Sequence, residues 1–151
     1  MSLGDFFPEK DRKEFAARKV SVGTVLKLKV FDTNPPKEKR FIVVGTTVDG
    51  LVLATVYLNT KINPVINYSA ELQALHIPLE EQGRDFLDHD SYVDCSRLVP
   101  REKREIEKAI QNRPDVVIGE LSTADFQLIR KTIISAHTIK GKHKKKFGFF
   151  L

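Results

Sequence analysis

The sequence contains one cysteine, no tryptophan and no long hydrophobic run, and no acidic residue follows Asp125. The single cysteine, Cys95, excludes a disulfide within the chain and is typical of a reducing compartment. We therefore predict a cytoplasmic protein in which Cys95 is a small core residue. A membrane-spanning helix needs about 20 consecutive apolar residues, so we expect none here. Met1–Pro8 lacks the basic and apolar regions of a secretory signal.

The sequence also lacks a glycine-rich phosphate loop, a nucleophile elbow and the usual spacing of metal ligands. The densest group of candidate ligands is Asp88-His89-Asp90. An extended backbone would direct its two carboxylates to one face and its imidazole to the other. His76 is out of phase with its apolar neighbours, so we expect it to be exposed. We predict no metal site and no cofactor.

Positive charge is concentrated at the C-terminal end. The net charge is +5, and five lysines between residues 140 and 146 account for it, which leaves the remainder formally neutral. A basic end is commonly solvated and disordered, and this is the simpler prediction for residues 140–151. Because Phe147, Phe149 and Phe150 lie among or beside the lysines, the segment could instead contact a phosphate backbone or a partner.

Three strands are predicted early in the chain, over Val22–Phe31, Arg40–Val48 and Leu51–Asn59. The last two are joined by Asp49-Gly50, a strong signal for a hairpin turn. Because a hairpin brings its two open ends together, we expect Arg40 and Thr60 to be neighbours. A guanidinium beside a hydroxyl at the rim of a sheet can form a phosphate site.

The rest of the chain predicts short strands, polar loops and helices. The predicted loops are Asp32–Lys39 and Thr60–Ser69. Further extended segments are predicted over Leu72–Leu79, Tyr92–Val99 and Val116–Leu121. Helices are predicted over Pro8–Lys19 and Pro100–Asn112, and a last helix is predicted to begin after its cap Ser122. This order favours a single domain, mainly β with helices, in which a small bent antiparallel barrel is closed by the last helix. We divide it into an N-terminal helical cover (1–20), the barrel (21–139) and a basic, aromatic tail (140–151).

Several short motifs then occur in a familiar order between Ser21 and Ile139. They are Gly23-Thr-Val25, Arg40-Phe-Ile-Val-Val44, the strand that ends in Asn59-Thr60, Asp90-Ser91-Tyr-Val93, and Gly119-Glu-Leu-Ser122 followed by Asp125 and Ile129. In this order and spacing the chain resembles the MazF/PemK-like endoribonuclease toxins, whose fold is a small SH3-like barrel with a C-terminal helix. The sequence departs from the family where Phe41 replaces the usual proline after the arginine and Ser96-Arg97 replaces an acidic-glutamine pair. The prolines of the loop before Arg40 also stand where glycines are common.

The resemblance implies metal-independent cleavage of RNA by attack of a ribose 2′-hydroxyl on the adjacent phosphate. It assigns catalytic roles to Arg40, which would stabilise charge on the phosphorane, and to Thr60. Residues beside this pair would bind the substrate, namely Lys39, Asn59, Lys61, Asn63, His89 and Ser91. His89 is also a candidate proton acceptor. The implied partners are RNA, a second copy in a homodimer, and a small antitoxin protein.

Two other functions fit the same sequence. In the first, the barrel has lost its acid–base groups and is a non-catalytic module that binds nucleic acid or a protein. In the second, the chain is an accessory domain of phage or mobile-element origin without toxin activity. For Arg40 and Thr60, the simpler alternatives are a surface arginine beside a strand and a turn residue.

Overall fold

The computed structural model describes residues 8–31 and 34–150. In chain order its elements are α1 (Glu9–Lys19), β1 (Thr24–Val30), β2 (Lys37–Thr46), β3 (Val52–Asn59), α2 (Ala70–Gln73), β4 (His76–Leu79), β5 (Ser91–Asp94), β6 (Val99–Glu102), α3 (Lys103–Asn112), the 3₁₀ turn η2 (Pro114–Val116), β7 (Val117–Glu120), α4 (Thr123–Ser135) and α5 (Gly141–Lys146). Within these residues, none of the helices has the length and apolar character needed to cross a bilayer.

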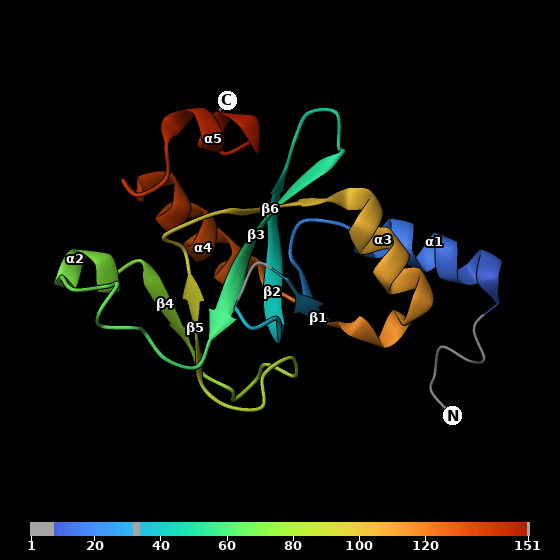
Figure 1. Cartoon of the computed structure of the whole chain (residues 1–151), viewed down its shortest axis with the longest axis horizontal. Helices are drawn as coiled ribbons and strands as arrows, with labels where there is room; N and C mark the ends of the chain where they lie inside the picture. Colours follow the sequence, from blue (N-terminus) through green and yellow to red (C-terminus); the bar gives the residue numbers. More distant parts are fainter. Residues whose placement is uncertain (1–7, 32–33, 151) are drawn as a thin grey trace.

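The strands form a curled antiparallel sheet in the order β4-β5-β3-β2-β1-β7, so the molecule combines a half-barrel with helices (Figure 1). Strands β5 and β6 pair with β3 along the same edge, β5 near its end and β6 near its start. Val93 of β5 pairs with Leu58 of β3, and Val99 of β6 pairs with Thr55. The chain thus advances six residues from β5 to β6 while β3 advances only three between the same two pairs. The intervening residues therefore turn out of the sheet, and the sequence pattern missed this break in the predicted segment Tyr92–Val99.

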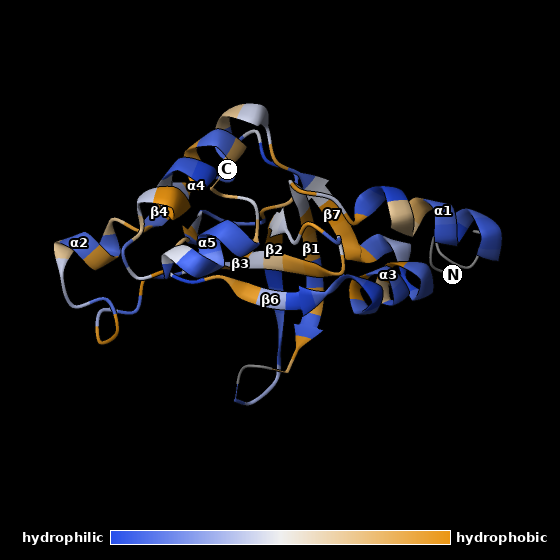
Figure 2. Cartoon of the chain, turned by 90° about the horizontal axis from the view of Figure 1, so that it is seen from above, coloured by the Kyte–Doolittle hydropathy of each residue, from blue (hydrophilic) through white to orange (hydrophobic). Residues whose placement is uncertain are grey.

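Both faces of the sheet are covered. On one face α1 and α3 lie side by side, and their residues Ala16, Ile106 and Ile110 join a core with Phe41 and Tyr57 (Figure 1). On the other face α4 and the C-terminal segment close a second core. Figure 2 shows hydrophobic residues concentrated on the strands and hydrophilic residues along α1 and α3. This double cover explains why residues 41–44 are apolar without alternation, since each side chain enters one of the two cores.

Several sequence-based boundaries are corrected by the structure. The second strand begins at Lys37 rather than Arg40, so the proline loop is shorter than predicted, and its Asp32 and Thr33 lie outside the described residues. The segment Leu72–Leu79 begins with the end of α2 and becomes a strand only at His76. Pro100 lies within β6, and α3 starts three residues later than expected.

The C-terminal segment is the largest correction. Instead of a disordered end it forms α5, and both Phe147 and Phe149 are buried in the core beneath it. The backbone of Phe147 passes so close to Gly45 of β2 that a Cβ atom at Gly45 would lie 2.6 Å from the Phe147 carbonyl oxygen. The sequence suggested no local order here because the anchoring aromatics follow a run of lysines, whose repulsion alone would favour an open chain.

Candidate functional site

The β2–β3 hairpin brings the two predicted catalytic residues to one rim of the sheet. Arg40 pairs with Leu58, and Thr60 follows two residues later, just beyond the end of β3. Both residues line a pocket of about 440 Å³, whose wall is completed by the loop before β5. The Arg40 side chain is about one-fifth exposed, so it is held by the sheet but accessible from the pocket.

A chain of polar contacts links Arg40 to Thr60 across this pocket. The Arg40 Nη2 lies 3.2 Å from Asp88 Oδ2, and the second Asp88 oxygen lies 2.9 Å from His89 Nδ1. The His89 Nε2 is in turn 3.1 Å from Thr60 Oγ1. Because an ionised carboxylate can only accept, a neutral His89 carries its proton on Nδ1 and accepts the Thr60 hydroxyl proton at Nε2. Asp88 therefore sets the orientation of the imidazole.

The electrostatics of the pocket centre on Asp88. The positive charge of Arg40 holds the pKa of this carboxyl below its usual range, with further contributions from the Arg40 hydrogen bond and His89. Asp88 is therefore ionised throughout the neutral pH range. Within residues 8–31 and 34–150, the buried Nε of Arg40 has no hydrogen-bond partner. The guanidinium consequently keeps unused donor capacity.

Three further side chains complete this pocket. Lys39 donates a hydrogen bond to Asn59 Oδ1 and lies over the ring of Tyr57, 5.3 Å from its centroid. Ser91 is buried and donates to the carbonyl oxygen of His89, which fixes the backbone beside the imidazole. Glu38 adds a second carboxylate to the wall. The pocket thus has cationic and anionic groups on β2 and a further carboxylate, Asp88, on the loop before β5.

A second pocket of about 610 Å³ adjoins the first and shares Thr60 with it. It is lined by Asn59, Thr60, Lys61, Asn63, Ile66, Asn67, His76, Asp94, Ser96 and Arg97. Together the two pockets contain all eight residues that the sequence selected as catalytic or substrate-binding. Asn63 also has a structural role, since its Oδ1 accepts from the Val65 amide and organises the loop after β3.

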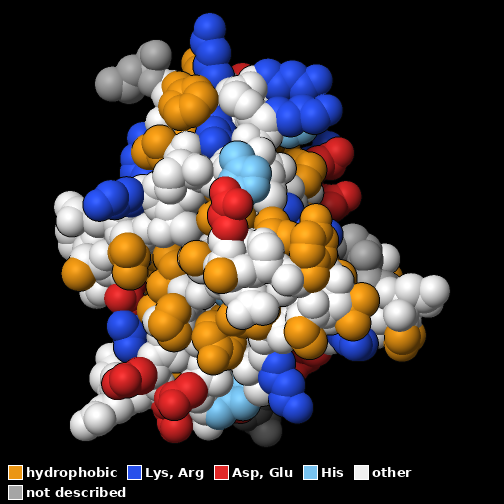
Figure 3. Space-filling model, turned by 90° about the vertical axis from the view of Figure 1, so that its left-hand side faces the viewer, with side chains coloured by type: hydrophobic (Ala, Val, Ile, Leu, Met, Phe, Trp, Pro, Cys, Tyr) orange, Lys and Arg blue, Asp and Glu red, His pale blue; other side chains and the backbone are white. Residues whose placement is uncertain are grey.

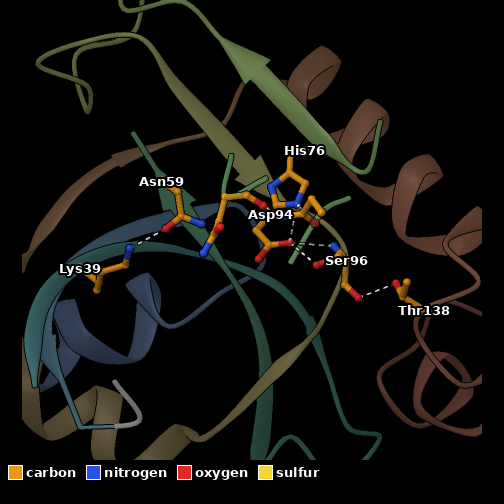
Figure 4. Close-up of polar contacts among 8 residues, drawn as sticks. Lys39, Asn59, His76, Asp94, Ser96 and Thr138 are labelled. Carbon is orange, nitrogen blue, oxygen red and sulfur yellow. Dashed lines mark hydrogen bonds and ion pairs between the residues drawn. The ribbon is translucent and has the colours of Figure 1, made fainter. Parts of the chain in front are cut away.

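Buried polar groups form the floor of this second pocket (Figure 4). His76 Nε2 lies 2.9 Å from Asn67 Oδ1 and 3.7 Å from Asp94 Oδ1. The same Asp94 oxygen accepts from the backbone and hydroxyl of Ser96. The Nδ1 of His76 is buried and has no hydrogen-bond partner among the residues that the structure describes. This floor presents amide, carboxylate and hydroxyl groups at fixed positions.

Two sequence expectations about the histidines are wrong. His76 is only 6% exposed, because β4 is covered on the side that faces the loop after β3. Asp88 and Asp90 do not share a face opposite His89, since the backbone is not a strand there. Asp88 instead contacts His89, while Asp90 accepts a hydrogen bond from the Glu81 amide.

Sequence reasoning missed Asp88 as a site residue, and it also missed His76, Asp94 and Arg97 in the second pocket. Asp88 meets Arg40 across 48 residues of sequence, so no local spacing could reveal the pair. The adjacency of Asp88 and His89 was visible, but the assumption of an extended backbone separated them.

Among residues 8–31 and 34–150, no group of three or more His, Cys, Asp or Glu side chains is arranged to hold a metal ion. Cys95 is fully buried, and its burial raises the pKa of its thiol to about 12. At neutral pH this residue is therefore a protonated, unreactive part of the core.

The chain was compared with protein-family models, with curated proteins and with solved structures. None of the three comparisons finds a match.

Proposed function

We propose that this protein is a metal-independent endoribonuclease that cleaves RNA at the pocket of Arg40 and Thr60. The observation that carries the proposal is the continuous chain from Arg40 through Asp88 and His89 to Thr60. It combines a permanent positive charge, a group that can accept and return a proton, and a hydroxyl. Phosphate transesterification by a ribose hydroxyl requires the first two of these groups, and the hydroxyl orients the second.

In the proposed reaction, the ribose 2′-hydroxyl attacks the adjacent phosphorus and gives up its proton to His89 Nε2. Asp88 stabilises the imidazolium, and Arg40 stabilises the negative charge that develops on the non-bridging oxygens. The P–O5′ bond then breaks, and the leaving oxygen takes a proton from the imidazolium or from water. The products are a 2′,3′-cyclic phosphate and a 5′-hydroxyl end. Thr60 holds the imidazole before the substrate displaces its hydrogen bond.

The second pocket would receive a base next to the cleaved phosphate. It begins at Thr60 and offers hydrogen-bonding side chains, including Asn63, Asn67 and Arg97. A base bound there would be read through its polar edge. Cleavage is therefore expected to be selective for sequence.

The finer fold and the biology belong to the same proposal. We infer an SH3-like barrel of the MazF/PemK type, supported by the curled sheet and by the position of α4 after β7. Lys39, Asn59, Lys61 and Ser91 would contact the substrate around the reacting phosphate. The enzyme would act in the cytoplasm as a homodimer, as the toxin of a toxin–antitoxin pair whose small antitoxin neutralises it.

The test is cleavage of a mixed-sequence RNA in the presence of EDTA, with mass analysis of the ends. The parent protein is expected to produce 2′,3′-cyclic phosphate ends and to leave the all-2′-deoxy oligonucleotide intact. The variant R40K should lose about 10²–10³-fold in rate, because a single ammonium cannot replace the guanidinium fork. The variant H89A should lose about 10²–10⁴-fold.

The matched control is R18K on α1, an exposed arginine that does not line either pocket, and it should cleave at the parental rate. Growth arrest by the parent and its loss with R40K would test the toxin assignment. Intact RNA with the parent protein, over a broad set of sequences, would contradict the proposal. So would full activity of both pocket variants.

A non-catalytic binding module is the second candidate, and the ion pair between Arg40 and Asp88 favours it. In this reading Asp88 occupies the Arg40 guanidinium, so the pocket does not stabilise a reacting phosphate, and the barrel holds nucleic acid or a protein through other residues. Salt-dependent binding of RNA without products would support this candidate.

A further inference from the structure

The C-terminal helix α5 presents a second cationic surface, defined here as Lys140, Lys142, Lys145 and Lys146. All four side chains are exposed. Within the part of the chain that the structure describes, none of these four ammonium groups forms an ion pair. Figure 3 shows Lys and Arg side chains gathered at the upper end of the molecule, the end where α5 lies in Figure 1.

Helix α5 is fixed to the rest of the molecule by hydrogen bonds and buried aromatic rings, and none of the four exposed lysines makes these contacts. Lys144 turns inward and donates to the carbonyl oxygen of Ile134 at 2.8 Å. Phe147 and Phe149 are buried, and Arg130 on α4 donates to the carbonyl oxygen of Gly148 at 3.2 Å. The four exposed lysines are therefore displayed on a rigid support.

The positive charges of the exposed lysines repel one another within α5. Lys142 is three and four residues before Lys145 and Lys146, so their side chains are neighbours on one helix face. A nearby carboxylate is Asp49, whose pKa is lowered mainly by a hydrogen bond from Thr47, with only a small contribution from Lys146. Like charges at this spacing destabilise a helix, and a bound polyanion would relieve the repulsion.

We propose that the exposed lysines of α5 bind the sugar–phosphate backbone of a single-stranded nucleic acid, at a site separate from the Arg40 pocket. Arg40 and Gly45 are about 17 Å apart along β2, and the C-terminal segment packs at Gly45. The surface therefore stands at the opposite end of the strand from the proposed cleavage site. It binds phosphates without reading bases, because lysine acts as a point charge on a flexible stem.

The neighbouring aromatic residues favour a nucleic acid over a membrane. Helices that lie on membranes insert a broad apolar face, but Phe147 and Phe149 are already buried in the core. Phe150 is 39% exposed, and its ring centroid is 5.8 Å from the Lys144 ammonium. One accessible ring beside a row of cations suits a stacked base better than an acyl chain.

The test measures binding of a fluorescent all-2′-deoxy oligonucleotide, which the proposed nuclease cannot cleave, over a range of salt concentrations. The triple variant K142Q/K145Q/K146Q should bind about tenfold or more weakly than the parent, and its salt slope should fall by about 2, because three phosphate contacts are lost. The control K10Q/K13Q/K108Q removes equal charge from exposed lysines of α1 and α3 and should bind like the parent. RNA cleavage in the pocket is assayed in parallel, so failure of the two proposals can be told apart.

Equal weakening in both triple variants would overturn the proposal, because it would indicate only general charge. Unchanged binding in the α5 variant would overturn it as well. Vesicles with 30% phosphatidylserine serve as a competitor. If they bind through the same lysines while the oligonucleotide does not, the surface is a membrane contact and the proposal is wrong. Circular dichroism of both triple variants verifies that each is folded.

Discussion

At the scale of single residues, the pocket depends on one carboxylate shared by two partners. Asp88 contacts Arg40 with one oxygen and His89 with the other. In the proposed reaction it is a positioning residue, because it acts on the phosphate only through its neighbours. That Arg40 and Thr60 lie at the same rim of the sheet could be inferred from the sequence, because a hairpin brings its two open ends together. Asp88 could not, because its position depends on how the loop before β5 folds back.

Replacement of Asp88 tests this positioning role. The variant D88N should lower the turnover number about 10–100-fold, because the amide cannot both hold the His89 Nδ1–H and balance the imidazolium. The ¹⁵N chemical shifts of His89 should report a changed tautomer population, which simple loosening of the loop would not produce. The control D90N removes a neighbouring carboxylate that binds the Glu81 amide instead, and it should keep both the turnover and the tautomer. A parental tautomer in D88N would contradict the role.

At the scale of elements, α4 is fixed to the loop after β4 by a two-pronged ion pair. Both Arg84 Nε and Nη2 lie 2.9 Å from Asp125 oxygens, and Ser122 caps the same helix by accepting from the Asp125 amide. The cap and the helix were predictable from local sequence. The ion pair was not, since Arg84 lies in a polar loop without periodicity. Local signals therefore identified the helix, while its attachment required the folded structure.

The Arg84–Asp125 pair should make stability depend on pH. The hydrogen bonds from Arg84 are the main cause that lowers the pKa of Asp125 in the folded protein. Its stabilisation is therefore complete well above the unfolded pKa of 3.8 and is lost as pH falls below that value. The variant D125N should lower the free energy of unfolding by about 1–2 kcal/mol at pH 7, measured by urea denaturation.

In the same variant, the fall in stability between pH 5 and pH 3 should be smaller than in the parent. The exposed pair of Arg113 and Asp115 provides the control, and D115N should change stability by less than about 0.5 kcal/mol. Parallel pH curves for D125N and the parent would contradict the assignment of the pH dependence to Asp125.

At the scale of the whole molecule, the sheet separates two cores, and the chain closes each of them with a different end. The helix of the N-terminal cover was predicted from composition, and its residues Ala16 and Val20 are buried, whereas residues 1–7 of the predicted cover lie outside the described residues. The C-terminal closure was not predicted, because burial of Phe147 and Phe149 depends on space left by Gly45 on a distant strand. Packing between residues so far apart in the sequence leaves no pattern in a short stretch of sequence.

The C-terminal closure should contribute to global stability. The variant F149A should lower the free energy of unfolding by about 3–5 kcal/mol, because it removes a buried ring and leaves a cavity. The adjacent variant F150A removes a ring of equal size from a partly exposed position and should cost less than half as much. Thermal and urea unfolding of the two variants gives the comparison. Equal losses would show that burial does not distinguish the two rings.

The contact between Gly45 and the Phe147 backbone also constrains how such a chain can diverge. A methyl group at residue 45 has no room while the C-terminal segment lies against β2. The glycine and the aromatic ending are therefore expected to be gained or lost together during evolution. A glycine near the end of the second strand, matched with alternating phenylalanines after a lysine-rich helix, is therefore a joint signature by which distant relatives can be sought.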